Sequence, residues 1–176
     1  MRKVTLYIAM SLDGYIADSN GNVDWLNGQD SNVENVDTYS TFIKNIDTVV
    51  MGWNTYHQVA TELSPNEWIY SALTSYIITH RVLQSTENLK FVQDDPCRVV
   101  QKLKQESGQG IWICGGASII CPLVQADLID EYYISIIPAL LGSGIRLWKK
   151  AENKIKLKLV RIGAYNGITE LVYMKR

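Results

Sequence analysis

The stretch that decides the fold reads GIWICGGASIICPL and covers residues 110–123. Its apolar first half predicts a buried strand, and the paired glycines Gly115 and Gly116 predict a sharp turn out of that strand. The small residues Ala117 and Ser118 then open a predicted helix. Because glycine has no Cβ, a ligand can approach the backbone closely there, and a helix N-terminus attracts negative charge. The stretch therefore predicts a strand–turn–helix unit that can hold a phosphate group.

A second stretch, NIDTVVMGWNTYHQV over residues 45–59, repeats this arrangement. A buried run ends at Gly52, and a helix begins near Asn54 and Thr55. The alternative interpretation is that Gly52 only makes a turn and that a polar side chain only caps the helix. Neither stretch contains the GxGxxG pattern of dinucleotide-binding proteins. Two such turns in one sheet nevertheless strengthen the phosphate prediction, because ligands bind outside the carboxyl ends of parallel strands.

Strand-like and helix-like segments alternate until about residue 138. The predicted strands cover 3–10, 47–52, 75–80, 89–93, 111–114, 130–137, 156–164 and 168–175, and the predicted helices cover 32–46, 54–63, 95–110 and 117–127. Such alternation predicts an α/β fold, with a mostly parallel sheet and helices on both of its faces. Asn166-Gly167 predicts the tight turn of a C-terminal antiparallel hairpin. No linker or repeat interrupts the pattern, so we expect a single domain over residues 1–176.

Two of these segments depend on periodicity alone. In the helix predicted over 32–46, apolar residues recur at steps of three and four, with Ser31 as its cap and Glu34 completing a capping box. In the segment 154–158, three lysines alternate with apolar residues. This period of two predicts a strand with one wet face.

Composition excludes several classes of function. The chain is 47% hydrophobic and 20% charged, with a net charge of −1, which is typical of a globular protein and offers no basic face for nucleic acid. No apolar run is long enough for a membrane helix, and the N-terminus lacks the pattern of a signal peptide, so we expect a cytoplasmic protein without a membrane partner. Three cysteines and two histidines lack zinc-site spacing. We expect no metal.

The carboxylates near the first loop, Asp13, Asp24, Asp30 and Asp37, include candidate proton donors. For each of them the alternative is an ordinary solvated side chain. The segment 138–148 carries Gly142 and Gly144, and it is either a mobile turn or a loop that contacts a ligand.

Four motifs together resemble one family. They are AMSLDGYIA, VVMGWNTY, IWICGGASI and LIDEYYISIIPALLGSG, which occur in this order and span nearly the whole chain. The sequence is similar to the reductase domain of the bifunctional riboflavin-biosynthesis deaminase–reductase, without the deaminase. The resemblance implies the dihydrofolate reductase-like three-layer fold, with a mostly parallel eight-stranded sheet. It also implies bound NADPH, with NADH as a possible substitute.

The resemblance further implies roles for individual residues. SLDGYIA would be the loop that follows the first strand and covers the nicotinamide, with Asp13 shaping its turn and serving, with Asp37, as a catalytic candidate. The residues implied at the cofactor are Ala9, Ile16 and Ala17 at the nicotinamide, Gly52, Asn54 and Thr55 at a phosphate, Thr79, His80 and Arg81 at the adenosine end, and Gly115, Gly116, Ala117 and Ser118 at the pyrophosphate.

Two departures from the family stand out. Where relatives commonly have arginine after Met-Gly, this chain has Trp53, which offers a stacking face for adenine but no positive charge for the 2′-phosphate. Counting back from the same motif, the acid that protonates a pterin in dihydrofolate reductases falls on Val36 or beside it on Asp37.

The resemblance implies an NADPH-dependent reductase of a pterin- or pyrimidine-like heterocycle, or of a ribosylaminopyrimidine imine. The alternatives are a reductase of other small imines or carbonyls, and a regulator that binds a dinucleotide without chemistry. A homodimer that uses the late strands and the apolar run 134–141 is also expected.

Overall fold

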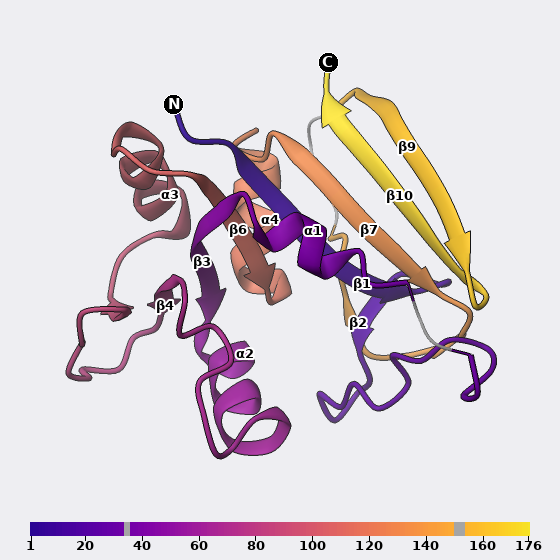
Figure 1. The fold of residues 1–176 in the computed structure, drawn as a ribbon. Coiled ribbons are helices and arrows are strands. Elements are labelled where there is room, and N and C mark those ends of the chain that lie inside the picture. The colour runs from indigo at the N-terminus through magenta and orange to yellow at the C-terminus, as the bar shows by residue number, and fades with distance from the viewer. Residues whose placement is uncertain (34–35, 150–153) are drawn as a thin grey trace.

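The computed structural model describes residues 1–33, 36–149 and 154–176 (Figure 1). In chain order its elements are β1 (Val4–Ser11), β2 (Tyr15–Ala17), α1 (Tyr39–Ile43), β3 (Ile46–Gly52), α2 (Trp53–Gln58), the π-helical turn η1 (Val59–Leu63), β4 (Thr74–Ile78), β5 (Leu89–Val92), α3 (Pro96–Gln105), β6 (Gly110–Gly115), α4 (Ala117–Gln125), β7 (Glu131–Ile137), β8 (Ile145–Arg146), β9 (Leu157–Tyr165) and β10 (Ile168–Lys175).

One eight-stranded sheet organises these elements, in the order β5-β4-β3-β6-β1-β7-β10-β9. All pairings from β5 to β7 are parallel, whereas β10 runs antiparallel to both β7 and β9. The hairpin turns at Asn166 and Gly167, whose φ angles of 44° and 75° lie in the left-handed region. The predicted α/β fold and its C-terminal antiparallel hairpin are therefore confirmed.

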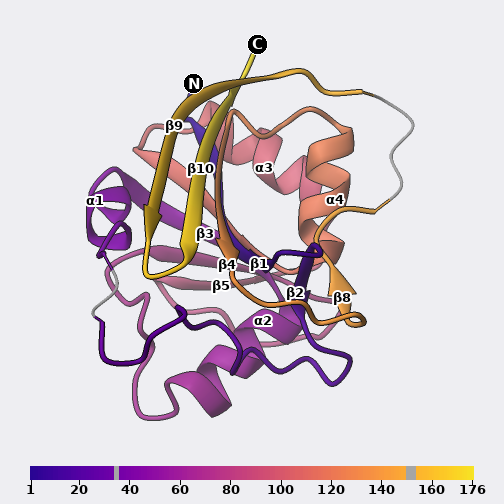
Figure 2. The ribbon, with the colours of Figure 1, turned by 90° about the vertical axis from the view of Figure 1, so that its right-hand side faces the viewer.

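The helices cover both faces of the sheet (Figure 2). On one face α3 and α4 pack on a cluster that includes Leu6, Val100 and Ile120. On the other face α1 and α2 lie over a more aromatic cluster, which includes Phe42 and Trp112. Strand residues alternate between these two clusters, as the period of two requires. We call the second surface the α1 face, and the carboxyl ends of the parallel strands the carboxyl edge.

The helix predicted over 32–46 is wrong in its extent, because only Tyr39–Ile43 is helical in the described part of this segment. Val33 and Val36 are exposed, so these two side chains do not form the buried helix face that their spacing predicts. The Asp37 carboxylate accepts a hydrogen bond from the Ser40 N–H, and such local side-chain bonds favour caps and turns over helix interiors. The proposed cap partner Glu34 lies outside the described residues.

The segment SLDGYIA is not wholly a loop. Ser11 still belongs to β1, and Tyr15–Ala17 forms the short strand β2, which pairs antiparallel with β8. The sequence analysis missed both β2 and β8, because each is shorter than the runs from which periodicity can be read. Their pairing joins the first loop to the segment that contains Gly142 and Gly144.

The alternation of exposed and partly buried residues predicted over 154–158 is confirmed, but the strand itself, β9, begins only at Leu157. The three lysines of 154–158 are exposed and alternate with partly buried residues, but Leu159, Val160 and Ile162 are then exposed as well. The pairing with β10 shifts register at this point, which is typical of a β-bulge. β9 is the last strand of the sheet, and within the described ranges these three apolar side chains are left exposed.

Candidate active site

The two glycine turns lie side by side at the carboxyl edge. β3 ends at Gly52 and leads directly into α2, and β6 ends at Gly115 and leads through Gly116 into α4. The two strands are neighbours in the sheet, with Met51 opposite Gly115. The chain therefore brings the two predicted phosphate turns to one place (Figure 1).

Space for a ligand is left where the glycines have no side chain. Gly115 has a φ of +135°, which strongly favours glycine, and its peptide bond to Gly116 is cis. A Cβ at Gly116 would have only Thr55 Oγ1 within 4 Å, at 3.6 Å. A Cβ at Gly52 would lie 3.1 Å from Ile119 Cγ1, so that turn also packs closely against α4.

Both helices that start at these turns leave their N-termini without a side-chain cap. Gly52 is the N-cap of α2 and Gly116 is the N-cap of α4, and neither helix has a side-chain capping hydrogen bond. The first N–H groups of a helix lack partners within the helix, and their dipoles favour negative charge. The donor set at this edge therefore fits the two phosphates of a dinucleotide.

The predicted adenosine end is assembled from α2 and the loop after β4. The Arg81 guanidinium carbon lies 4.5 Å from the centre of the Trp53 ring, in a cation–π contact. The Arg81 backbone N–H donates to Thr79 Oγ1 over 3.1 Å, which fixes the start of this loop. His80 and Asn54 are exposed. Arg81 therefore places a positive charge beside Trp53, which carries no charge of its own.

The three residues expected at the nicotinamide come from β1 and β2. Ala9 is partly exposed and pairs with Ser135 of β7. Ala17 is buried, whereas Ile16 is partly buried and packs against the core cluster under α4. Ala9 is thus the residue of this set with accessible surface on the α1 face.

Asp13 joins the turn after β1 to the segment before β8. Its carboxylate accepts hydrogen bonds from Ser11 Oγ at 2.6 Å, Leu141 N at 3.1 Å and Gly142 N at 2.7 Å. The Ser11 hydroxyl and then the backbone N–H groups lower the pKa of Asp13 to about 2. Asp13 is thus an ionised carboxylate that holds two loops together, and its catalytic role stays a prediction.

Asp37 lies away from the glycine turns, in a groove between α1 and the outer strands. Its pKa is lowered by the hydrogen bonds that it receives from Ser40. The groove has a volume of about 650 Å³, and Lys3, Tyr133 and Arg161 lie on the other side of it. The structure therefore does not bring Asp13 and Asp37 together, and the catalytic role of Asp37 also stays a prediction.

An aromatic wall stands on the α1 face beside the second glycine turn. The Trp112 ring lies 5.1 Å from Tyr70 and 5.7 Å from Tyr39, and its indole N–H donates to the Tyr7 carbonyl oxygen. Burial raises the pKa of the neighbouring Cys114 thiol to about 12, so the thiol is neutral and unreactive. Trp112 is 4% exposed and belongs to the core cluster of this face, so the wall is part of the core packing.

Sequence reasoning missed an ion pair on the same face. Glu170 of β10 is 1% exposed, and Arg161 of β9 pairs with it. The available signal was the period of two in the last strand, which puts Glu170 in phase with the buried Ile168 and Val172. A glutamate at a core position of a strand predicts a special role, because carboxylates are almost never fully buried unless they are paired.

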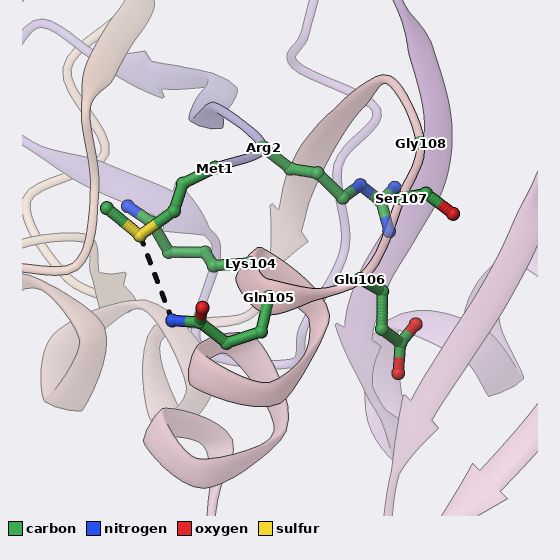
Figure 3. A pocket seen from close by; sticks show the side chains of 7 residues that line it. All are labelled: Met1, Arg2, Lys104, Gln105, Glu106, Ser107 and Gly108. Atoms are coloured by element: carbon green, nitrogen blue, oxygen red, sulfur yellow. Dashed lines mark hydrogen bonds between the residues drawn. The ribbon is translucent and has the colours of Figure 1, made fainter.

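A separate hollow of about 380 Å³ lies at the opposite end of the sheet, around the residues labelled in Figure 3. Arg2 contributes to its wall, but the guanidinium is bonded to Asp47 and to Thr48 Oγ1. Met1 Sδ meets Gln105 Nε2 across the hollow (Figure 3). The far hollow is therefore bordered by residues that serve the packing of the N-terminus.

Among residues 1–33, 36–149 and 154–176, no group of three or more His, Cys, Asp and Glu side chains is placed to hold a metal ion. Within the same ranges, no helix is long and apolar enough to cross a membrane.

Comparison with known families gives one match over most of the chain. Residues 2–169 match the model of the RibD C-terminal domain. The uncharacterized protein YwjB of Bacillus subtilis is 37% identical, over 99% of this chain and 98% of YwjB. The riboflavin biosynthesis protein RibD of Haemophilus influenzae is 25% identical, over 96% of this chain and 55% of RibD. The chain thus corresponds to about half of that relative.

Solved structures with the same fold extend the comparison. A Shewanella sp. PV-4 protein, named for riboflavin biosynthesis, superposes with a TM-score of 0.79 and 26% identity, over 99% of both chains. A deaminase/5-amino-6-(5-phosphoribosylamino)uracil reductase of Thermotoga maritima has a TM-score of 0.67 and 13% identity, over 99% of this chain and 57% of that one. Enterococcus faecalis dihydrofolate reductase, solved with NADP(H), has a TM-score of 0.67 and 13% identity, over 98% of this chain and 96% of that one. The last two show the shared fold alone.

Proposed function

The chain belongs to the RibD C-terminal domain family, and from that premise we propose that it is an NADPH-dependent reductase of a pyrimidine- or pterin-like heterocycle, or of a ribosylaminopyrimidine imine. The family is one of oxidoreductases of the riboflavin-pathway type. One observation carries the proposal: two helices with glycine N-caps and no side-chain cap begin side by side at the carboxyl edge. That arrangement suits a pyrophosphate.

When bound, the nicotinamide cofactor supplies the hydride, and the residues of this chain hold it in place. The N–H groups that follow Gly52 and Gly116 would hold the phosphates, and Thr55 Oγ1 lies close to the second turn. Trp53 offers a face to the adenine, and Arg81 offers charge to the 2′-phosphate. Ala9 leaves room for a flat ring over β1. Such positioning brings the reacting carbon atoms close together.

Reduction of a C=N bond also needs a proton. The pKa values of Asp13 and Asp37 are both lowered, so both carboxylates are ionised at neutral pH. A carboxylate in that state accepts a proton rather than donating one, which favours water as the donor. The two aspartates then act through position and charge.

Titration with NADPH and with NADH tests which cofactor the protein binds, and quenching of tryptophan fluorescence reports the binding. Turnover is then measured on a panel of pterins and on 5-amino-6-(5-phosphoribosylamino)uracil and its ribosylamino relatives. We expect tighter binding of NADPH than of NADH, and oxidation of NADPH with at least one pyrimidine or pterin. Absence of dinucleotide binding would refute the proposal.

Two alternatives give different results in the same experiment. A reductase of other small imines or carbonyls would oxidise NADPH only with non-heterocyclic compounds. A non-catalytic regulator would bind NADPH without turnover on any compound. The homodimer and the cytoplasmic location expected from the sequence stay predictions.

A further inference from the structure

The side chain of Gln58, the last residue of α2, forms a hydrogen bond with a distant loop. Its Nε2 group donates to the carbonyl oxygen of Gly21 over 2.9 Å, and both residues are partly buried. Within the described ranges, no other hydrogen bond joins α2 to the segment between β2 and α1. Because α2 begins at one glycine turn of the candidate dinucleotide site, this bond connects that site to the first loop.

Gly21 belongs to a turn that is ordered by its own hydrogen bonds. The Asp18 carboxylate accepts from the N–H groups of Asn20 at 2.7 Å and Asn22 at 2.8 Å. The Gly21 N–H donates to the Asp18 carbonyl oxygen at 3.1 Å. The Asn22 N–H and then the other donors lower the pKa of Asp18, so its carboxylate is ionised at neutral pH. We call residues 18–22 the Asp18 turn.

The Asp18 turn is also braced on the side of β2 and β8. It follows β2 directly, and Ser19 Oγ donates to Ser143 Oγ over 3.1 Å. Gly144 packs so closely on this backbone that a Cβ there would overlap the Ala17 carbonyl oxygen. The segment before β8 therefore holds the turn from one side, and Gln58 holds it from the side of α2.

The Gln58–Gly21 bond spans the candidate active site. β6 lies between β3 and β1 in the sheet, whereas α2 continues β3, and β2 with the Asp18 turn follows β1. Figure 1 shows α2 and β2 on either side of the point where β6 ends. Gln58 lies at the far end of α2, roughly 8 Å along the helix from its first residue. The bond therefore closes a ring of chain around the space beyond the turn at Gly115 and Gly116.

We propose that Gln58 is a positioning residue that gates the dinucleotide site through the Asp18 turn. A dinucleotide enters or leaves the ring only while the Gln58–Gly21 bond is broken, and the bond forms again over the bound molecule. Gln58 acts on the loop and makes no contact with the cofactor. This inference rests on the proposed function and adds the step that sets how fast the cofactor exchanges. Release of a bound molecule from beneath a loop limits the turnover of many enzymes.

Stopped-flow fluorescence with NADPH measures the association and dissociation rate constants separately. The key variant is Gln58→Met, which keeps the length of the side chain but has no N–H group to donate. Because the bond is formed in both the free and the bound protein, its loss should raise the open fraction of both states by the same factor. One neutral hydrogen bond changes an equilibrium by about fivefold, so both rate constants should rise about fivefold, with Kd unchanged.

Gln105→Met is the matched control. Gln105 is likewise the last residue of its helix, α3, and its Nε2 group contacts Met1 Sδ at 3.8 Å at the opposite end of the sheet (Figure 3). Both variants replace a glutamine at a helix end, so their local effects on the helix are alike. Gln105→Met should bind and release NADPH at the wild-type rates. Faster exchange in this control as well would mean that Gln58→Met acts by general loosening of the fold, and would overturn the assigned role.

Other results would also overturn the inference. A folded Gln58→Met with wild-type rate constants would mean that the bond serves stability only. Faster dissociation without faster association would mean that Gln58 holds the bound cofactor rather than the loop. In both cases NADPH still binds, and the proposed dinucleotide site stands. Wild-type protein that binds no NADPH would refute the proposed function and the inference together.

Asp18→Ala tests the same link from the side of the loop, and it provides the answer if Gln58→Met does not fold. The change removes the acceptor that orders the Asp18 turn, so Gly21 is no longer held within reach of Gln58. We expect both rate constants for NADPH to rise several-fold, again without a change in their ratio. Wild-type rate constants in this variant would contradict the gating role of the turn.

Discussion

Two helices of similar length, α3 and α4, begin in opposite ways. Asp95 precedes α3, and its carboxylate accepts hydrogen bonds from the N–H groups of Cys97 and Arg98. Gly116 precedes α4, and no side chain caps that helix. Both helices pack on the same face of the sheet, so their packing does not explain the difference.

The two helix starts differ in their position across the sheet. All three helices begin at the carboxyl edge, but α3 follows the edge strand β5, whereas α2 and α4 follow the adjacent inner strands β3 and β6. A side-chain cap stabilises a protein by about 1 kcal/mol. The start of α4 lacks this stabilisation, which leaves its N–H groups able to bind a ligand. We interpret the bare N-termini as the dinucleotide site and α3 as structure.

The largest effect is expected at the bare end of α4. Gly116→Val should weaken NADPH binding by about a hundredfold or more, because the branched side chain fills the space that a pyrophosphate needs. The fold should tolerate the change, since a Cβ there meets only Thr55 within 4 Å. Fluorescence titration gives the affinity, and circular dichroism reports the fold. A folded variant that still binds NADPH like the wild type would show that this turn is not the phosphate site.

The next effect concerns the end of α2. Trp53→Arg should strengthen NADPH binding by about 1.5–3 kcal/mol, roughly ten- to a hundredfold, by a charge-assisted contact with the 2′-phosphate. Arg81→Ala should remove most of the preference for NADPH over NADH, because the Arg81 guanidinium lies over the Trp53 ring. Both effects should shrink as salt is raised. Equal changes for NADPH and NADH would mean that this end of α2 does not face the 2′-phosphate.

A smaller effect is expected at the loops that close on this edge. Asp13→Ala should lower turnover roughly tenfold, because the turn and the Gly142 segment lose their common anchor. Unchanged kinetics with a clear shift in Tm would favour a purely structural anchor.

The same variant has a defined pH dependence. The pKa of Asp13 is lowered from 3.8 to about 2, so its stabilising contribution is present above pH 3.8 and is lost as pH falls through about 2. Wild type should therefore be more stable than Asp13→Ala at neutral pH, and the difference in Tm should disappear near pH 2. A difference that is independent of pH would contradict the ionised anchor.

The smallest effect on binding is expected at α3. Asp95→Ala removes its cap and should lower stability by about 1 kcal/mol, or about 2–4 °C in Tm, without any change in NADPH affinity. It is the matched control for Gly116→Val, since one change acts on stability and the other on binding. Weaker NADPH binding by Asp95→Ala would remove the distinction between the two helix starts.

The sequence predicted the parts of this fold that depend on repeated local signals. Glycine turns after apolar strands, a proline at the start of α3 and Asn166-Gly167 in the hairpin each specify backbone geometry directly. The long helix over 32–46 was wrong because periodicity describes a possible face, and Val33 and Val36 find no partner there.

The candidate site was predicted less completely. The two glycine turns meet because β3 and β6 are neighbours, and the motifs themselves indicate that edge. The Arg161–Glu170 pair could not be predicted, since it depends on the register of β7, β10 and β9. Strand order joins residues far apart in the chain, and periodicity carries no information about it.

The most direct test follows the backbone amides of isotope-labelled protein by NMR as NADPH is added. We expect the largest shifts on the first amides of α2 and α4, from Trp53 to Thr55 and from Ala117 to Ile119. The corresponding amides of α3, Cys97 and Arg98, should not move, because Asp95 already holds them. Shifts at the start of α3 with none at α2 and α4 would mean that the dinucleotide does not bind at the uncapped helix starts.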